Sequence, residues 1–113
     1  MACKQDVRIR MRFLAGALVA ATLTASAAAG PGKEFTVTIE GMQFHPEQLT
    51  LDRGDHIVWV NKDLFPHTAT AARVFDSGSI AADGSWSYTA AKSGEYAYSC
   101  TFHPTMKGKI TVQ

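Results

Sequence analysis

Residues 94–112 read GEYAYSCTFHPTMKGKITV and give the clearest indication of the class of fold. In the run from Glu95 to Cys100, aromatic side chains and the cysteine stand two residues apart, which puts them on one face of a β-strand. Pro104 prevents that strand from continuing, because proline lacks the N–H that a strand interior needs. Lys107 to Val112 then supplies a second strand. The stretch predicts two strands joined by a short loop, with the Cys100 sulfur pointing into the core.

The same strand signals recur in the chain before this stretch. Apolar or β-branched side chains alternate with polar ones, and turn residues return every eight to twelve positions. No helical period is sustained after residue 30, and no internal repeat is present. Short strands at this spacing are typical of an antiparallel sandwich or barrel. We expect a single all-β domain over residues 30–113, with further strands at residues 35–40, 49–51, 56–60, 68–74 and 85–89.

The first 29 residues differ in composition from the rest and predict a secretory signal peptide. A basic lead is followed by an apolar run from Phe13 to Ala25, and then by small residues that offer cleavage near Ala27 or Ala29. The apolar run is short for a membrane span, so we expect cleavage and no stable membrane insertion, rather than a retained anchor. Met11 is an alternative start, because a shorter signal peptide already begins there. The prediction is export to the periplasm.

Charge and cysteine content exclude several classes of protein. The formal net charge is +1 over 113 residues, which is too close to zero for a nucleic-acid binder. Removal of the leader would leave a net charge of −2 and one cysteine, Cys100, because Cys3 lies in the leader. A disulfide framework is then excluded within the mature chain. A lone cysteine in an oxidising compartment is expected to be buried or bound to a metal.

Four potential metal ligands stand in two short motifs. Cys100, His103 and Met106 follow one another at intervals of three residues, and His67 lies upstream, directly after Pro66. A thiolate, two imidazoles and a weakly bound thioether are the ligand set of a trigonal copper site with a long axial methionine. We therefore expect one copper ion to be bound by these four residues.

Other interpretations of the same residues are less favoured. Zinc would require more thiolate or carboxylate ligands, and methionine binds zinc poorly. A cysteine–histidine nucleophile pair would need solvent access, which a core-facing Cys100 does not have. Cys100 and Met106 could be ordinary core residues, although their spacing from His103 argues against this. The remaining histidines, His45 and His56, are expected at the surface rather than among the ligands.

Paired motifs along the chain resemble those of the cupredoxin family. They span about residues 34 to 112 and read Gly54-Asp55, Trp59-Val60-Asn61, Pro66-His67-Thr68, Phe75-Asp76-Ser77-Gly78, Gly94-Glu95-Tyr96 and Cys100-Thr101-Phe102-His103-Pro104-Thr105-Met106-Lys107-Gly108. The chain is similar to plastocyanins and most of all to amicyanins, whose ligand loop has the same C-x2-H-x2-M spacing. The resemblance implies a Greek-key β-sandwich of about seven or eight strands. It also implies single-electron transfer through one type 1 copper ion.

Two positions depart from the pattern of that family. Thr68 stands where many members have asparagine directly after the first histidine ligand, and Phe102 stands where amicyanins have proline. Both residues neighbour the Cys100 sulfur. Phe102 has a backbone N–H, which proline lacks, and we expect it to donate a hydrogen bond to that sulfur. The reduction potential therefore does not carry over from the family.

An uncharged patch is expected around His103, formed by Phe65, Pro66, Phe102 and Pro104, with Met42 either at its rim or in the core. Such a patch would let redox partner proteins dock briefly to a monomeric carrier. The predicted function is that of an exported electron carrier. The alternative is a copper-binding protein for copper delivery, storage or resistance, which would use the same ligands. An enzyme is not expected, because a second copper site would need more histidines than remain.

Overall fold

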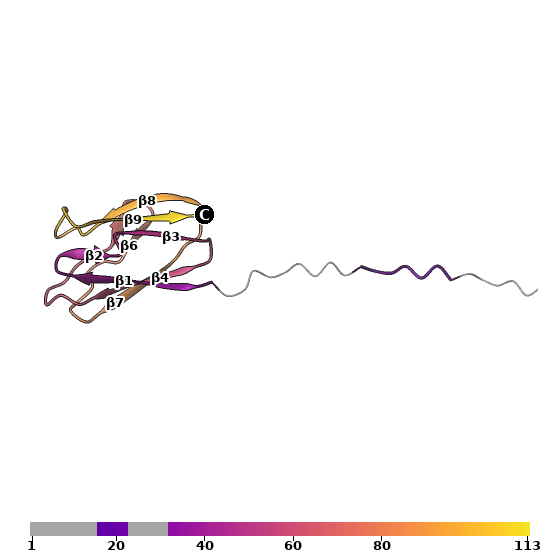
Figure 1. Cartoon of the computed structure of the whole chain (residues 1–113), viewed down its shortest axis with the longest axis horizontal. Coiled ribbons are helices and arrows are strands. Elements are labelled where there is room, and N and C mark those ends of the chain that lie inside the picture. Colours follow the sequence, from indigo (N-terminus) through magenta and orange to yellow (C-terminus); the bar gives the residue numbers. More distant parts are fainter. Residues whose placement is uncertain (1–15, 23–31) are drawn as a thin grey trace, which may run out of the picture.

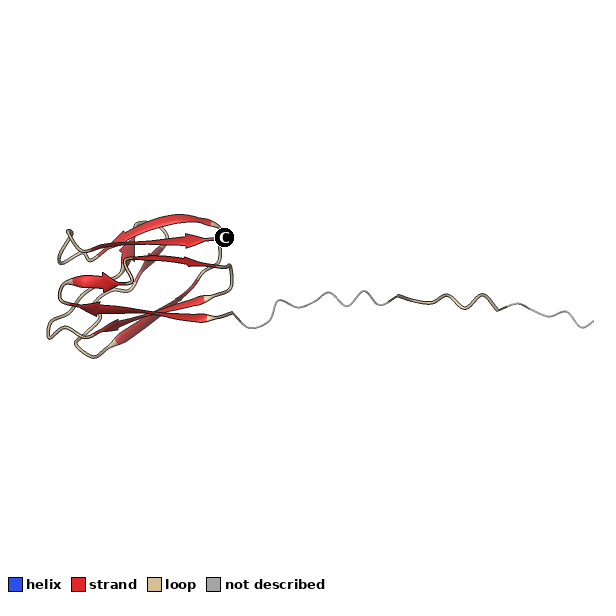
Figure 2. Cartoon of the chain, in the orientation of Figure 1, coloured by secondary structure: helices blue, strands red, loops and turns tan. Residues whose placement is uncertain are grey.

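The computed structural model describes residues 16–22 and 32–113. The predicted signal peptide, including the cleavage positions at Ala27 and Ala29, lies outside these ranges except for residues 16–22. Within the described residues there is no helix, and so none that is long and apolar enough to cross a membrane. Figure 2 shows that the described domain consists of strands and loops.

Nine strands form two sheets within the described residues, and the sheets make a Greek-key β-sandwich (Figure 1). One sheet has the strand order β2-β1-β4-β7, and the other has the order β3-β9-β8-β5-β6. The strands are β1 (Glu34–Glu40), β2 (Gln43–His45), β3 (Gln48–Leu51), β4 (His56–Asn61), β5 (Thr70–Ala71), β6 (Phe75–Asp76), β7 (Ser85–Thr89), β8 (Gly94–Ser99) and β9 (Lys107–Val112).

Both sheets contain a parallel strand pair, which corrects the expectation of purely antiparallel pairing. β1 runs parallel to β4, with Glu34 opposite His56 and Ile39 opposite Asn61. β3 runs parallel to β9. These pairs arise because β2 and β3 lie in different sheets. The chain changes sheet after β2 and returns to the first sheet along β4, in the same direction as β1.

The strand count exceeds the expected seven or eight because two segments differ from the prediction. Residues 68–74 do not form one strand, since β5 ends at Ala71 and the chain turns back into β6. Arg73, in this turn, has a φ of 66°, which no strand residue adopts. The three-residue strand β2 was not expected either, because so short a segment shows no alternation to detect.

The core fills the space between the sheets and extends to the predicted ligand loop. Along β4 the side chains alternate as expected, with Ile57 and Trp59 fully buried and their neighbours half-buried. The Trp59 ring packs at centroid distances of 5.4–5.6 Å against the rings of Phe75, Trp86 and Tyr98. Cys100 and Met106 belong to the same buried cluster. The loop that carries them is thereby anchored in the packed core.

Candidate metal centre

The predicted ligands lie in two loops at one end of the sandwich. His67 ends the loop that follows β4, and Cys100 directly follows the last residue of β8. His103 and Met106 lie in the loop between β8 and β9. Figure 1 shows this loop at the end of the domain opposite the C-terminus.

Backbone hydrogen bonds close the loop between β8 and β9 on itself. The N–H of Cys100 donates to the carbonyl oxygen of Met106 at 3.2 Å, and the N–H of His103 donates to the carbonyl oxygen of Cys100 at 3.2 Å. The N–H of Met106 donates to the carbonyl oxygen of His103 at 2.9 Å. The spacing of three residues in the sequence therefore brings these residues back to one place.

Three nitrogen and sulfur atoms converge at this place. The Cys100 Sγ lies 3.7 Å from Nδ1 of His67 and 3.8 Å from Nδ1 of His103. All three atoms lie within 4.8 Å of one another. A nitrogen at about 2.0 Å and a sulfur at about 2.3 Å from one shared ion, at about 120° to each other, are about 3.7 Å apart. The observed separations match that geometry, so the donor set fits one metal ion in a trigonal arrangement.

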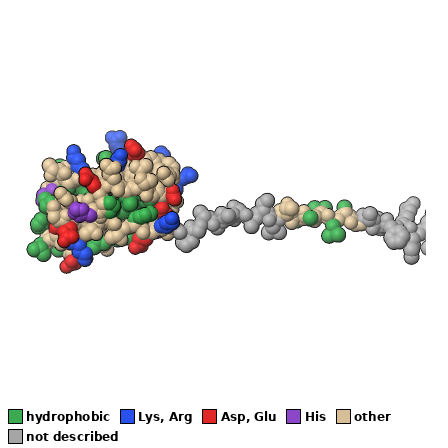
Figure 3. All heavy atoms as spheres, in the orientation of Figure 1, with side chains coloured by type: hydrophobic (Ala, Val, Ile, Leu, Met, Phe, Trp, Pro, Cys, Tyr) green, Lys and Arg blue, Asp and Glu red, His purple; other side chains and the backbone are tan. Residues whose placement is uncertain are grey.

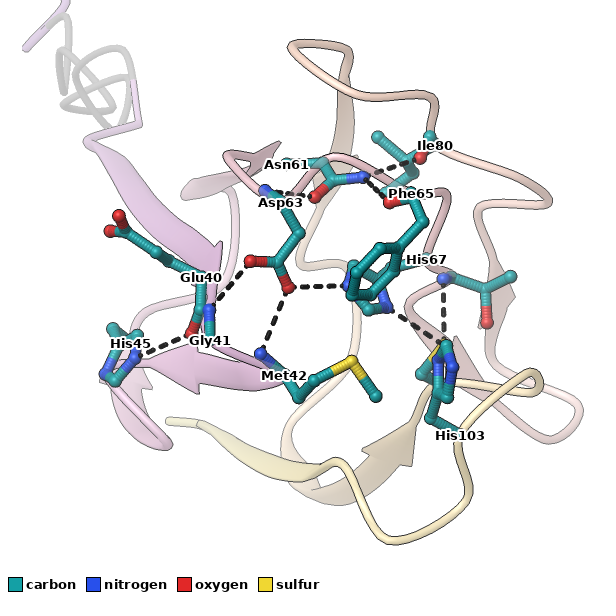
Figure 4. A network of polar contacts seen from close by, with 12 residues as sticks. Glu40, Gly41, Met42, His45, Asn61, Asp63, Phe65, His67, Ile80 and His103 are labelled. Atoms are coloured by element: carbon teal, nitrogen blue, oxygen red, sulfur yellow. Dashed lines mark hydrogen bonds and ion pairs between the residues drawn. The ribbon is translucent and has the colours of Figure 1, made fainter.

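A carboxylate fixes the orientation of the buried His67 ring. The Nε2 of His67 lies 2.8 Å from Oδ2 of Asp63, while His67 itself is fully buried (Figure 4). The ring proton is held on Nε2 by this acceptor, which leaves the Nδ1 lone pair free on the side of Cys100. His67 is therefore prepared as a metal ligand.

Asp63 is itself held as an anion by backbone amides of the turn between β1 and β2. Burial raises the pKa of its carboxyl group, but N–H donors outweigh that effect. The amides of Met42 and Gly41 donate to Asp63 at 3.0 and 2.8 Å, and together with His67 they lower its pKa below the usual value. No motif in the sequence marks Asp63. The one feature that could have indicated its role is that this carboxylate stands four residues before the predicted ligand His67.

The loop between β4 and His67 is held by Asn61, which is fully buried. Its Nδ2 donates to the carbonyl oxygens of Phe65 at 2.8 Å and Ile80 at 3.0 Å, and its Oδ1 accepts the N–H of Asp63 at 3.0 Å (Figure 4). This side chain fixes both Asp63 and the backbone that leads into His67. The sequence marked Asn61 as a strand end and as part of a family motif, but gave no sign of this role.

The hydrogen bond to the Cys100 sulfur comes from a different residue than expected. The N–H of Thr68 donates to Sγ at 3.3 Å, and no such bond from Phe102 is present in the described structure. Thr68 directly follows His67 in the chain and is buried. Phe102 instead lies at the surface with 53% of its area exposed.

His103 is the ligand nearest to solvent, since it is half-buried whereas the others are buried. The residues expected around it are all exposed at the surface: Phe65, Pro66, Phe102 and Pro104. The Phe65 ring lies 5.9 Å from the His103 ring, and Leu64 beside it is 94% exposed. Figure 3 shows hydrophobic and histidine side chains together at this end of the domain.

The other predicted surface residues lie outside the cluster. His45 is exposed and its Nε2 lies 3.2 Å from the carbonyl oxygen of Glu40. His56 is half-buried and its Nδ1 lies 2.8 Å from the Thr89 hydroxyl. Met42 is half-buried, packs against the core and lines a surface pocket with Met106, so it lies at the rim of the site.

Comparison with known proteins places this architecture in a family. Residues 13–112 match the family described as the cupredoxin-like domain. The chain belongs to the cupredoxins. The resemblance drawn from the paired motifs is therefore confirmed.

This cupredoxin is similar to two bacterial amicyanins. It is 30% identical over 94 residues to the amicyanin of Paracoccus versutus, across 78% of this chain and 71% of that protein. It is 28% identical over 119 residues to amicyanin-alpha of Methylorubrum extorquens, across 93% of this chain and all of that protein. The predicted similarity to amicyanins is confirmed.

Solved structures of copper proteins have the same fold. The Cu(I) form of an amicyanin variant superposes with a TM-score of 0.67 at 26% identity, over 77% of this chain and 87% of that chain. A copper-containing nitrite reductase from Thermus scotoductus superposes with a TM-score of 0.67 at 31% identity, over 71% of this chain. The matched part is 22% of the reductase chain.

Proposed function

We propose that this cupredoxin is an exported carrier of single electrons, with one copper ion held by His67, Cys100, His103 and Met106. The observation that carries the proposal is the convergence of Cys100 Sγ with two imidazole Nδ1 atoms at 3.7 and 3.8 Å. One copper ion bound by these residues supplies a Cu(I)/Cu(II) couple that takes up and returns one electron. Thiolate, imidazole and thioether donors together suit copper better than other common metals.

The protein supports electron transfer by keeping the ligands in place. Cys100 and Met106 are buried in the core, and His67 is locked by Asp63. The N–H of Thr68 stabilises negative charge on the Cys100 sulfur. A site whose ligands move little between the two oxidation states exchanges electrons with little rearrangement. The thioether of Met106 would supply a weak fourth donor to a bound copper ion.

The exposed apolar surface around His103 supports transient docking of redox partner proteins. Phe65 and Phe102 have 43% and 53% of their area exposed, and the Phe65 ring lies 5.9 Å from the ring of the half-buried His103. Weak electron-transfer complexes bury little surface, and a small uncharged patch suits a partner that must leave again. We propose that the protein acts as a monomer, with His103 as the point nearest to the partner.

Export to the periplasm is the cellular setting that the sequence of the leader supports. A signal peptide over residues 1–29 would deliver a single domain over residues 30–113. The same setting is oxidising, and there an unpaired Cys100 is best protected by burial and a bound metal. The similarity to a nitrite reductase does not indicate an enzyme, because this chain spans only 22% of that protein.

An absorption spectrum of the copper-loaded protein tests the proposal. A Cys100 thiolate bound to Cu(II) in a trigonal site should produce an intense visible charge-transfer band. Cys100→Ser should remove the band while the far-ultraviolet circular dichroism of the sandwich is retained. A colourless Cu(II) form of the unmodified protein would contradict the proposed electron carrier.

The alternative role in copper delivery, storage or resistance uses the same ligands and makes a different prediction. A delivery protein should lose copper quickly to a chelator or to an acceptor protein. An electron carrier should retain copper through many cycles of oxidation and reduction.

A further inference from the structure

A series of hydroxyl groups connects the Cys100 side of the metal centre to the protein surface. The Oγ1 of Thr68 lies 2.9 Å from the Oγ1 of Thr101 and 3.0 Å from the Oγ1 of Thr70. The Oγ1 of Thr70 also lies 3.1 Å from Oδ1 of Asp76, whose side chain is exposed at the end of β6. None of these residues is a metal ligand, and two of them lie in β5 and β6, away from the ligand loops.

The Thr68 hydroxyl forms the full number of hydrogen bonds that a hydroxyl can make. Its oxygen accepts the N–H of Thr101 at 2.8 Å and the O–H of Thr70. Both lone pairs are then used, so the proton of Thr68 is left to be donated to the Oγ1 of Thr101. A side chain with three partners is held in one rotamer, and its backbone is held with it.

The backbone that this hydroxyl holds is the donor to the copper-binding sulfur. The N–H of Thr68 donates to Cys100 Sγ at 3.3 Å, and the N–H of Thr101, which follows Cys100, donates to the Thr68 hydroxyl at 2.8 Å. The two ligand segments are therefore joined by a reciprocal pair of hydrogen bonds. The strength of the N–H bond to sulfur depends on how firmly the Thr68 side chain is held.

Thr70 has one hydroxyl proton and two acceptors at nearly equal distance. The Thr68 oxygen lies at 3.0 Å and the Asp76 carboxylate oxygen at 3.1 Å. Any share of the proton that the carboxylate takes is lost to Thr68. Asp76 is kept in place for this competition because the same Oδ1 accepts the N–H of Gly78 at 2.9 Å.

We propose that Thr70 and Asp76 are positioning residues that adjust, with opposite signs, the hydrogen bond from Thr68 to the Cys100 sulfur. Thr70 strengthens this bond by holding Thr68, and Asp76 weakens it by drawing the Thr70 proton away. The inference rests on the proposed function only in treating Cys100 as a copper ligand. Reduction leaves more negative charge on the sulfur, so a stronger N–H bond favours the reduced site and raises the reduction potential.

Thr70→Val tests the first half of the inference, because valine has the shape of threonine and carries no charge. In the copper-free protein, the Thr68 amide should exchange its hydrogen roughly three- to tenfold faster, the factor that a hydrogen bond of ordinary net strength contributes. In the copper-loaded protein, the reduction potential should fall and the charge-transfer band should move to longer wavelength. The matched control is Thr111→Val, a half-buried β9 position with no side-chain hydrogen bond in the described structure.

Asp76→Asn tests the second half. The amide oxygen of asparagine still accepts the N–H of Gly78 but competes less well for the Thr70 proton. The Thr68 amide should then exchange more slowly, by up to about twofold, since a proton shared equally between two acceptors is at most doubled in favour of one. The charge-transfer band should move to shorter wavelength.

Either of two results overturns the inference. One is a Thr70→Val protein that behaves like Thr111→Val in amide exchange, band position and potential. The other is an Asp76→Asn protein that shifts Thr68 exchange in the same direction as Thr70→Val. Failure of the proposed function is recognised separately, because an unmodified protein without a thiolate–copper band would disprove the carrier. The exchange rates of the copper-free proteins would still decide whether Thr70 and Asp76 act on Thr68 with opposite signs.

Discussion

At the residue scale, two hydrogen bonds prepare the cluster before any metal is bound. The Asp63 carboxylate holds the ring of His67 at 2.8 Å, and the N–H of Thr68 points at the sulfur of Cys100 at 3.3 Å. The first contact selects which ring nitrogen is free for a metal, and the second favours charge on the thiolate. Both act on side chains that are fully buried and cannot reorient easily.

Asp63→Asn should weaken copper binding about 10- to 100-fold, which is the usual effect of losing the outer partner of a histidine ligand. An asparagine side chain has one acceptor oxygen where Asp63 has two, so it cannot serve the amides of Gly41 and Met42 together with His67. Competition with a chelator of known affinity measures the change. Asp52→Asn is the control, since the Asp52 side chain is exposed, and equal affinities in the two variants would contradict the role assigned to Asp63.

The same variant should lower the stability of the copper-free protein by about 1–3 kcal/mol at neutral pH. Because the pKa of Asp63 is lowered on folding, its carboxylate stabilises the fold above the unfolded pKa near 3.8. That contribution is lost as the pH falls through the lower folded pKa. Urea unfolding at pH 7 and at pH 3 should therefore show a difference between wild type and Asp63→Asn that shrinks in acid.

At the scale of elements, the pairing of β8 with β9 holds the two ends of the ligand loop together. Tyr98 on β8 lies opposite Gly108 on β9, and the residues that flank the loop are paired as Ser99 with Lys107. The Tyr98 ring lies directly over Gly108, where a Cβ atom would overlap it. Glycine is required here because an aromatic ring of the core lies against the backbone.

Gly108→Ala should therefore destabilise the protein by about 1–3 kcal/mol, the usual cost of forcing an extra methyl group into a packed region. Urea unfolding of the copper-free protein measures this cost. In a Tyr98→Ala background the ring is absent, and the same substitution at position 108 should cost much less. A cost that is independent of Tyr98 would show that the strain lies in the backbone and not in this contact.

The sequence predicted best those elements whose side chains alternate within one strand. The strand at residues 56–60 and the strand from Lys107 to Val112 were expected and are present. The prediction of one strand over residues 68–74 was wrong, because a β-prone composition does not reveal the turn at Arg73. The parallel pairs were also missed, since which sheet a strand joins depends on contacts far apart in the sequence.

The metal centre, too, was predictable only in part. The three converging donors of His67, Cys100 and His103 were predictable from ligand type and spacing, and the structure brings them together. The support of His67 by Asp63 was not predictable, because aspartate is common in loops and forms no spacing pattern. The hydrogen bond to the sulfur was assigned to the wrong amide. Thr68 and Phe102 were both expected beside the Cys100 sulfur, and the donor is Thr68, which is 32 residues from Cys100 in sequence.

At the scale of the whole molecule, aromatic side chains of the two sheets pack against each other in the core. Tyr98 is 4% exposed and contacts the rings of Phe44 and Trp59. Burial raises the pKa of Tyr98 to about 12, because the ionised phenolate is poorly solvated there. Deprotonation of this one group therefore opposes the fold as a whole.

The stability of the copper-free protein should fall as the pH rises from about 10 to about 12. A tyrosine whose pKa is raised on folding contributes stability below its unfolded pKa of 10, and that contribution is lost as the pH rises through the folded value. A shift of this size corresponds to about 2–3 kcal/mol. Tyr98→Phe should lose most of this dependence, the remainder coming from Tyr88, whose pKa burial also raises, whereas Tyr96→Phe should retain it. Urea unfolding measures the stability of each variant. An equal loss of stability in the two variants between about pH 10 and about pH 12 would contradict the assignment to Tyr98.

The sandwich places its metal-binding loops at the end of the domain opposite the C-terminus (Figure 1). The His103 end is thereby left open to a partner, while the core and Asp63 hold the remaining ligands. This arrangement suits a protein that exchanges electrons at one end and keeps its metal throughout.

Cyclic voltammetry of the copper-loaded protein tests that central claim most directly. A carrier should show a reversible one-electron wave whose height is unchanged over many cycles, with all copper still bound to the protein afterwards. A wave that decays as copper appears in solution on reduction would contradict electron transfer by a rigid site and would favour copper delivery instead.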